Sequence, residues 1–579
     1  MKQRSLSAVA GLTAVGVIAL PLASLLSREA TSIIYLDQGW SAERRSEFYY
    51  TPQGSRLIPY SWMLALEEPD SERLFLDPSH LERLGYITEG TASALNPDGL
   101  PIGFVKEPSH ASERPWLGLT CAACHTGEVT LKGKRIRVDG GPSLADFQAF
   151  TTRLGQALDA TLADLGKIER FAGRLKETDL RTLRPELEAF AAGYRKLLAG
   201  NWTPEPYGHA RLDAFGHILN AVAADALGES ANTRIPNAPV SYPFLWTTPQ
   251  QRYVQWNGIA VSPIGRNTGE VLGVFGQVAL TGLERERFRS SVLTANLHAL
   301  EKWIAELKAP VWPESQFGRI NTGKHARGRE LFIEHCQNCH GGVPYRFTAA
   351  EDNIVGRRLI DVRMVDQKKI GTDPTMLQNF YGRRARTGSL APNLGGVDEQ
   401  HAGSVLGLVI QGVVKRDLDE RGLSVAKQAE YAGFRFKSDG TPEDPWQGPP
   451  AYKAGPLAGI WATAPYLHNG SVPTLYDLLS PEEERPAVFW VGSRELDPLK
   501  VGFVSSATEL SEADRARLFR FDTTRPGNSN KGHVFPDPSQ ARLDHEDRLA
   551  LIEFIKTIED PTAPAPYRVL DAPTQGTRP

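Results

Sequence analysis

Sulfur-containing residues are scarce in this chain, with only four cysteines and four methionines among 579 residues. Small secreted domains that rely on disulfides are far richer in cysteine, so a disulfide framework of that kind is excluded. An excess of one charge is also lacking, because 65 Lys and Arg stand against 68 Asp and Glu, a net charge of −3. Nucleic-acid-binding domains normally carry a strong basic excess, so no nucleic-acid partner is predicted.

Long apolar runs are lacking beyond the N-terminus, where Lys2 and Arg4 precede an uncharged stretch over residues 5–27. This pattern is typical of a secretory signal, and we predict that residues 1–30 are a cleaved signal peptide. An uncleaved N-terminal membrane anchor is the alternative, since the run is long enough to cross a bilayer. The protein is then periplasmic or secreted, and it meets a membrane only if this segment stays attached.

The length predicts two to four domains, at roughly 150 residues per domain. A hydrophobic content of 41% allows a sizeable core, and the 53 glycines and 41 prolines indicate long ordered loops.

All four cysteines belong to two copies of one motif. Cys121 and Cys124 are followed by His125, and Cys336 and Cys339 are followed by His340. C-x-x-C-H is the attachment sequence of haem c, in which both thiols form thioethers and the adjacent imidazole binds the iron. The sequence therefore predicts two covalently bound haem c groups.

Zinc binding or dithiol redox chemistry are the alternatives for these cysteines. Ribbon-type zinc sites join pairs about 15–20 residues apart, far closer than Cys121 and Cys336. A thioredoxin-like dithiol needs a βαβ context, which the sequence does not show. Haem attachment is the better interpretation.

A helical pattern begins at Ser143, which with Asp146 resembles a capping box. Apolar residues then recur at three- and four-residue spacing, which predicts a core-facing helix: Phe147, Phe150, Leu154, Leu158, Leu162 and Leu165. Helical character continues to about residue 230. An aromatic, turn-rich tract over 237–277 follows, and then a helix near 286–308.

The second motif has the context of a small cytochrome c. Residues 328–332 lead into Cys336 like an N-terminal helix, and Leu551, Phe554, Ile555 and Ile558 mark an amphipathic C-terminal helix. We expect these two helices to pack together. The predicted fold class is mainly α, with two cytochrome c-like haem domains, long loops and an extra helical insertion. The predicted boundaries are 31–319 for the N-terminal haem domain with its insertion, 320–562 for the C-terminal domain, and 563–579 for a flexible tail.

The second axial ligand of each iron has few candidates among the methionines, which are Met1, Met63, Met364 and Met376. Methionine is a common ligand in electron-carrying cytochromes c. Several histidines stand in polar surroundings and are expected to be exposed: His80, His110, His401, His533 and His545. His468 differs because of the sequence around it.

Residues 459–475, Gly-Ile-Trp-Ala-Thr-Ala-Pro-Tyr-Leu-His-Asn-Gly-Ser-Val-Pro-Thr-Leu, carry an A-P-Y-x-H-x-G sequence. It resembles the signature of the bacterial dihaem cytochrome c peroxidase superfamily. The amino-acid sequence from His468 onward is most similar to that of the dihaem rubber-oxygenase-like branch, and so are residues 254–258 and 265–270. The resemblance covers most of the chain after about residue 100.

The resemblance implies that His125 is the proximal ligand of the N-terminal haem and that His340 and His468 both bind the C-terminal iron. A six-coordinate iron with two imidazoles would move electrons and not bind substrate. The alternative is that His468 is structural and that Met364 or Met376 is the ligand, as in the peroxidases.

The N-terminal haem would then be the reactive one, with its distal wall in the 237–277 tract. Glu270 could move protons for peroxide activation, whereas Trp256 or Phe275 could line a dry pocket for dioxygen and an apolar substrate. The sequence does not decide which of them faces the iron.

We therefore predict a haem-dependent oxidoreductase of the peroxidase or dioxygenase type. It would activate peroxide or dioxygen at the N-terminal haem, with electrons passing through the C-terminal haem. Its partners would include an apolar substrate or a small redox donor protein. A non-catalytic dihaem electron-transfer cytochrome c is the alternative. Dihaem peroxidases often hold calcium as well, but no loop of this sequence supports a calcium site.

Overall fold

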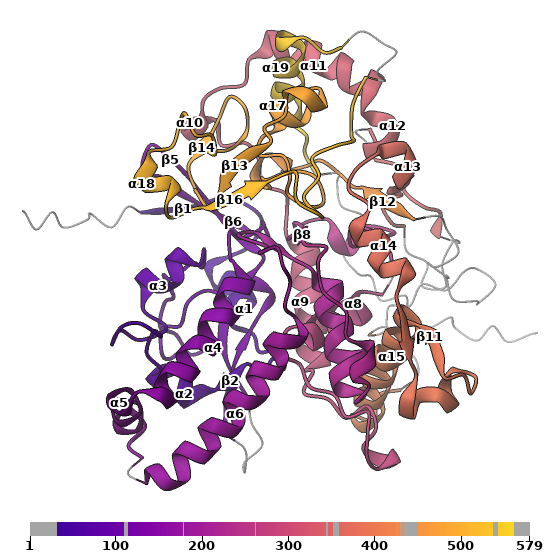
Figure 1. Ribbon diagram of the computed structural model, residues 1–579. Helices are drawn as coiled ribbons and strands as arrows, with labels where there is room; N and C mark the ends of the chain where they lie inside the picture. The colour runs from indigo at the N-terminus through magenta and orange to yellow at the C-terminus, as the bar shows by residue number, and fades with distance from the viewer. Residues whose placement is uncertain are drawn as a thin grey trace, which may run out of the picture.

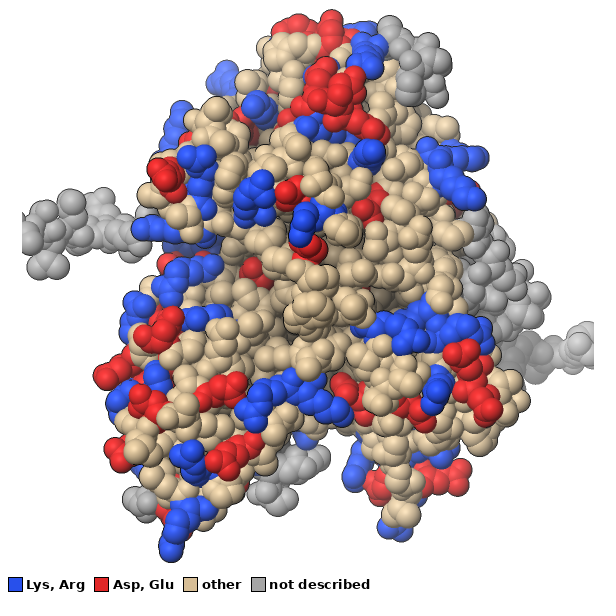
Figure 2. Space-filling view, viewed as in Figure 1, with Lys and Arg blue, Asp and Glu red and all other residues tan. Residues whose placement is uncertain are grey.

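The computed structural model describes residues 32–108, 114–177, 179–260, 262–342, 345–350, 358–424, 427–428, 431, 450–536 and 542–560 (Figure 1). The predicted signal or anchor segment, 1–30, and the predicted tail, 563–579, lie outside these residues. Within them, no helix combines the length and the apolar character that a bilayer span requires. Figure 2 shows basic and acidic side chains interspersed over one face, as the near-neutral charge leads one to expect.

Two small sheets surround the first C-x-x-C-H motif. One sheet has the order β1 (Ile33–Tyr35), β6 (Lys134–Asp139), β5 (Thr126–Leu131), and the other has the order β2 (Ile58–Pro59), β4 (Trp116–Leu119), β3 (Phe104–Glu107). β1 runs parallel to β6, and the remaining pairs are antiparallel. The motif lies in the turn between β4 and β5, so the two sheets fix both of its ends.

Three helices form the predicted insertion: α4 (Phe147–Ala163), α5 (Leu165–Leu175) and α6 (Leu180–Gly200). The predicted stripe is largely buried, with Phe150 and Leu154 fully inaccessible. The predicted cap is wrong, however. Asp146 caps α4 by accepting from the Ala149 N–H at 2.8 Å, whereas the Ser143 hydroxyl donates to the Ala123 carbonyl at 2.9 Å, inside the haem motif.

The expected helical character up to about residue 230 is present, since α7 (Ala214–Leu219) continues as a π-helix over Asn220–Ala226. The 237–277 tract differs from the expectation of turns, because α8 (Pro263–Gly273) occupies its end. α8 packs against α7, α9 (Thr294–Glu306) and α15 (Ala402–Glu420). The turn residues before Pro263 concealed this helix.

The helices α11 (Thr322–His335) and α19 (His545–Ile555) pack together, which confirms that expectation. They lie side by side at the top of Figure 1. Phe332 and Phe554 meet with ring centroids 5.1 Å apart. Gly328 makes the close crossing possible, because a Cβ there would lie 1.9 Å from the Ala550 carbonyl oxygen. The short helix α12 (Gln337–His340) carries the second motif.

The C-terminal part adds small two-stranded sheets, and one of its segments returns to the N-terminal sheet. Its strand pairs are β9 (Arg363–Asp366) with β12 (Ala451–Ala454), β10 (Arg384–Arg386) with β11 (Glu399–His401), β13 (Val488–Val491) with β16 (Phe519–Asp522), and β14 (Leu496–Asp497) with β15 (Gly502–Phe503). Thr130 of β5 forms a bridge with Glu495, and Arg494 reaches the buried Glu128 carboxylate at 3.2 Å. The two parts of the chain are thereby joined.

Short elements complete the described structure: α1 (Ala42–Tyr50), α2 (Tyr60–Ala65), α3 (Pro78–Arg83), β7 (Arg211–Leu212), β8 (Val240–Ser241), α10 (Glu314–Phe317), α13 (Gln367–Ile370), α14 (Thr375–Gly382), α17 (Leu475–Leu478) and α18 (Glu512–Arg515). The predicted mainly-α class is wrong, because the described residues are 43% helical and 14% strand, with strands in several small sheets. These strands are two to six residues long, too short to show an alternating pattern in the sequence. The predicted domain boundaries stay predictions.

Candidate haem-binding site

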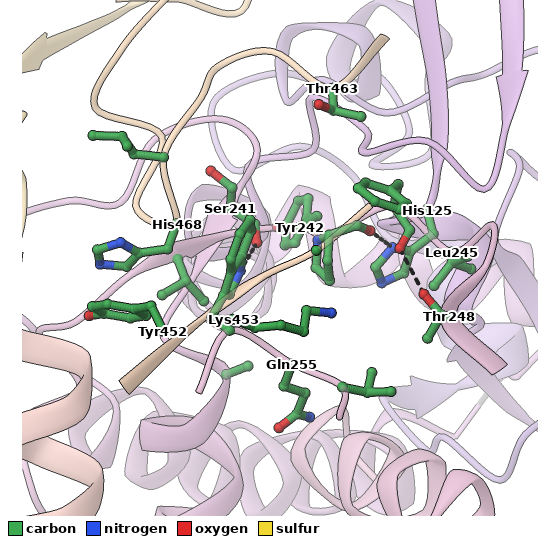
Figure 3. Close-up of a pocket in the computed structure, with 18 of the residues that line it drawn as sticks. His125, Ser241, Tyr242, Leu245, Thr248, Gln255, Tyr452, Lys453, Thr463 and His468 are labelled. Carbon is green, nitrogen blue, oxygen red and sulfur yellow. Dashed lines mark hydrogen bonds between the residues drawn. The ribbon is translucent and has the colours of Figure 1, made fainter. Parts of the chain in front are cut away.

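Both C-x-x-C-H motifs open onto one cavity of about 400 Å³. The cysteines and histidine of each motif line it, together with aromatic and aliphatic side chains from β8, α8, β12 and the loop after β12. In Figure 3, His125 and His468 lie on opposite sides of the view, with Tyr242, Ser241 and Lys453 between them. Two segments that are far apart in the sequence thus share one interior space.

His125 is oriented by the backbone. Its Nδ1 lies 2.8 Å from the carbonyl oxygen of Pro243. A carbonyl only accepts, so Nδ1 carries the proton and Nε2 keeps its lone pair. Burial lowers the pKa of His125 to about 4, so the imidazole is neutral at pH 7. A neutral imidazole fixed through Nδ1 is the usual form of a metal-binding histidine.

His340 repeats this arrangement in the second motif. Its Nδ1 donates to the carbonyl oxygen of Gly455 at 2.9 Å, and burial lowers its pKa. The Cys336 N–H donates to the Phe332 carbonyl, so the motif continues directly from the end of α11. Both histidines therefore offer Nε2 as a ligand.

The cysteine thiols fit covalent attachment. All four are free, and burial raises the pKa of Cys121, Cys124 and Cys336 to about 12. Among the residues that the structure describes, no three His, Cys, Asp or Glu side chains converge as a free metal-ion site would require. Two protonated thiols beside one oriented imidazole, facing an apolar cavity, are the donor set of a haem c.

His533 is the residue that sequence reasoning missed. Its ring lines the cavity with its centroid 6.1 Å from that of His340. A metal–imidazole bond is about 2 Å long and a ring nitrogen lies about 1 Å from the ring centre, so two imidazoles on one metal have centroids about 6 Å apart. The two rings are therefore far enough apart to hold one metal ion between them, which makes His533 a candidate ligand.

The backbone around His533 is held firmly. The His533 N–H donates to the Ile370 carbonyl at 2.8 Å, and the buried Arg485 donates to the His533 carbonyl at 3.2 Å. Gly532 passes so close to residues 371 and 372 that a Cβ would lie 2.3 Å from the Thr372 nitrogen. In the sequence, only Gly532 beside His533 could have indicated a closely packed backbone at this position. The polar residues around His533 favoured an exposed position instead.

The other histidines that were expected to be exposed differ in their burial. His80 is buried, with Nδ1 donating to the Phe75 carbonyl at 2.7 Å, and His401 is partly buried. His545 is exposed as predicted, and His110 lies outside the described residues.

His468 lies in the same cavity but has an aromatic environment. Its ring stacks on Tyr452 at a centroid distance of 4.0 Å and lies 6.5 Å from the ring of Trp256. The His468 carbonyl accepts from the Ser241 N–H at 2.8 Å. Of the two methionines proposed as alternative ligands, Met376 lines the cavity, whereas Met364 lies on β9. The predicted role of His468 as a ligand stays a prediction, and His533 now competes with it.

The three residues predicted for the distal wall of the N-terminal haem line two different cavities. Glu270 and Trp256 line the haem cavity. Phe275 lies in a neighbouring cavity of about 970 Å³, with its ring 5.9 Å from that of Phe147. The chain turns at Phe275, where φ is +66°, after α8 ends at Gly273. This turn directs the side chain toward α4, so Phe275 lines the neighbouring cavity and not the haem cavity. Its predicted distal role stays a prediction.

Glu270 belongs to a polar group at the first motif. Gln255 Nε2 donates to Glu270 Oε1 at 3.4 Å, and Arg266 lies 3.9 Å from the same oxygen. Arg266 itself is paired with the buried Glu301 at 2.6 Å. Protein surrounds Glu270, yet its side chain is 39% accessible because it faces the cavity. Burial raises the pKa of Glu270, which favours a carboxyl that can hold a proton.

Comparison with known proteins identifies a cytochrome c-like segment in the C-terminal part of the chain. Residues 451–490 match a family described as RoxA-like, cytochrome c-like. The chain is 34% identical over 582 residues to the uncharacterized protein y4iJ of Sinorhizobium fredii (strain NBRC 101917 / NGR234), which covers 91% of this chain and 93% of that protein. It is 26% identical over 365 residues to y4iM, another uncharacterized protein of the same strain, across 61% of this chain and 72% of that protein.

Proposed function

Because the chain belongs to the same family as y4iJ and contains a RoxA-like, cytochrome c-like domain, we propose that it is a dihaem c-type oxidoreductase. Cys121, Cys124 and His125 would hold one haem, and Cys336, Cys339 and His340 the other. When bound, each haem supplies a redox-active iron. Since haem c is attached outside the cytoplasm in bacteria, we also propose a periplasmic or secreted location.

The observation that carries the proposal is the different surroundings of the two motif histidines. His340 has the imidazole of His533 as a neighbour, with ring centroids 6.1 Å apart, and both residues would hold one haem iron. Among the described residues, no imidazole approaches His125 in this way, and the polar side chains of Glu270, Arg266 and Gln255 lie at that end of the cavity. The first motif suits a reactive site, and the second suits electron transfer.

Peroxide is the substrate that these side chains support best. Its activation requires a group that moves a proton between two oxygens, and Glu270 is a carboxyl with a raised pKa in the cavity. Gln255 and Arg266 would orient that carboxyl. The dioxygenase alternative loses Phe275 as a wall residue, although Trp256 remains. A small redox protein would be the electron donor.

Spectral titration of the purified holoprotein tests the class of protein. We expect two covalent haems per chain, of which one responds to cyanide or imidazole and the other stays low-spin. If both haems were low-spin and unresponsive, the protein would be an electron carrier instead.

Peroxide turnover with a reduced cytochrome donor tests the role of Glu270. We expect Glu270→Gln to lower the rate by about 10²–10⁴-fold, since a general acid–base group contributes that much. Glu72→Gln, which changes a carboxylate that is 77% exposed, is the matched control. Equal turnover in both variants would exclude Glu270 from proton transfer.

A further inference from the structure

Lys453 is a partly buried cation that lines the haem cavity, and no residue that the structure describes gives it an acidic partner. It lies on β12, where its N–H donates to the Trp256 carbonyl at 2.8 Å. Its side chain lines the cavity, and Figure 3 shows it extending between the sides occupied by His468 and His125. Protein surrounds the amine.

The ammonium group is incompletely satisfied. Nζ donates to Gln251 Oε1 at 2.7 Å, and the described residues offer its other two N–H bonds no acceptor. They also provide no carboxylate as an ion-pair partner. A buried charge of this kind is costly unless it is paired. Accordingly, burial and the nearby charge of Arg266 lower the pKa of Lys453 to about 7.

Two other buried cations near this cavity, Arg266 and Arg211, are held by protein groups. Arg266, which lines the same cavity, is paired with Glu301 at 2.6 Å. Arg211 has no carboxylate, but it donates to the carbonyls of Tyr207 and Asn469 and to the Asn528 side chain. Lys453 differs in that its remaining donors are directed to a space in which a bound molecule would lie.

We propose that Lys453 is the counter-charge of a haem propionate, so that its ammonium binds a carboxylate that the cofactor brings into the cavity. This inference rests on the proposed attachment of two haems to the C-x-x-C-H motifs. A haem carries two propionates, and each of them needs a cation or hydrogen-bond donors once it is removed from water. Lys453 lines the one cavity that both motifs share, and Arg266 is already engaged with Glu301.

Reduction potentials of the holoprotein test this role without any substrate. The variants are Lys453→Met, which removes the charge at similar length, and Lys453→Arg, which keeps it. Lys369→Met, at an exposed position, is the control. We expect Lys453→Met to lower the potential of one haem, because loss of a positive charge makes the iron harder to reduce. Lys453→Arg and Lys369→Met should leave both potentials near those of the wild type.

A second variant changes Gln251, the hydrogen-bond partner of the Lys453 ammonium. Gln251→Glu places a carboxylate at the atom that now accepts from Lys453, so it should compete with the propionate and lower the same potential. If Lys453→Met retains two haems and both potentials are unchanged, the inference is overturned. If Lys453→Met loses a haem, retention by Lys453→Arg supports the charge role, and equal loss by Lys453→Arg overturns it. Wild-type protein without covalent haem would instead refute the proposed function.

Discussion

The imidazole ring of His533 lies across the cavity from that of His340, with 6.1 Å between the ring centroids. We expect His533→Ala to convert one of the two haems from low-spin to high-spin, because that iron loses its second nitrogen ligand. His468→Ala should leave both spin states unchanged, since its ring is stacked on Tyr452.

Electron paramagnetic resonance and visible spectra of the two holoprotein variants decide between these residues. His545→Ala, at an exposed histidine, serves as the control. A high-spin signal in His468→Ala and none in His533→Ala would restore the pair of His340 and His468 implied by the family resemblance.

Each cysteine pair should hold one haem. Replacing Cys121 and Cys124 by alanine should reduce the covalent haem content from two to one per chain, and the same change at Cys336 and Cys339 should do so independently. Pyridine haemochrome spectra give the stoichiometry. Zinc found by elemental analysis, with no covalent haem, would reverse the assignment of both motifs.

Gly328 limits how closely α11 and α19 approach. A Cβ at this position would lie 1.9 Å from the Ala550 carbonyl oxygen, so Gly328→Ala must force the helices apart. We expect a loss of about 1–3 kcal/mol in the free energy of unfolding, as in other overpacked sites. Gly323→Ala in the same helix is the control, because its Cβ would meet only Asn321 Oδ1, at 3.5 Å. Denaturant unfolding measures both, and equal effects would contradict a special role for the crossing.

Glu128 should make the stability of the protein fall in acid. Burial opposes ionisation of its carboxyl, but the charges of Arg137 and Arg494 and a hydrogen bond from Arg135 outweigh burial and hold the pKa below the usual 4.5. A folded-state pKa below the unfolded value stabilises the protein above about pH 4.5, and this contribution is lost as the pH falls below that value.

Glu128→Gln should remove this part of the pH dependence. It should also lower the free energy of unfolding at pH 7 by about 3–5 kcal/mol, because the fully buried guanidinium of Arg137 loses its nearest carboxylate and keeps only Glu89, at 3.7 Å. Glu188→Gln, which breaks an exposed pair with Arg184, should cost less than about 1 kcal/mol. Melting curves across pH check both variants, and parallel profiles for wild type and Glu128→Gln would refute the assignment.

Local patterns in the sequence predicted only part of the fold. The stripe from Phe147 to Leu158 predicted a buried helix face because a 3.6-residue period is visible within one segment, whereas Leu165, also expected in the stripe, is exposed beyond the end of α4. The spacing of Leu551, Phe554 and Ile555 did the same for α19. Short strands such as Ile58–Pro59 have no such period, since their pairing with Leu117 and Trp116 depends on residues distant in the chain. The predominance of helix was overestimated for this reason.

The sequence by itself predicted the haem chemistry, because C-x-x-C-H places two thiols and one imidazole within five consecutive residues. Only the tertiary structure decided what lies opposite those motifs. His533 and Lys453 reach the cavity, and Phe275 leaves it, through backbone turns and strand pairings that join distant segments. A covalent attachment motif consists of neighbouring residues and can be recognised from the amino-acid sequence. The second ligand, the counter-charge and the wall of a cavity are relationships in space, which arise only when the chain has folded.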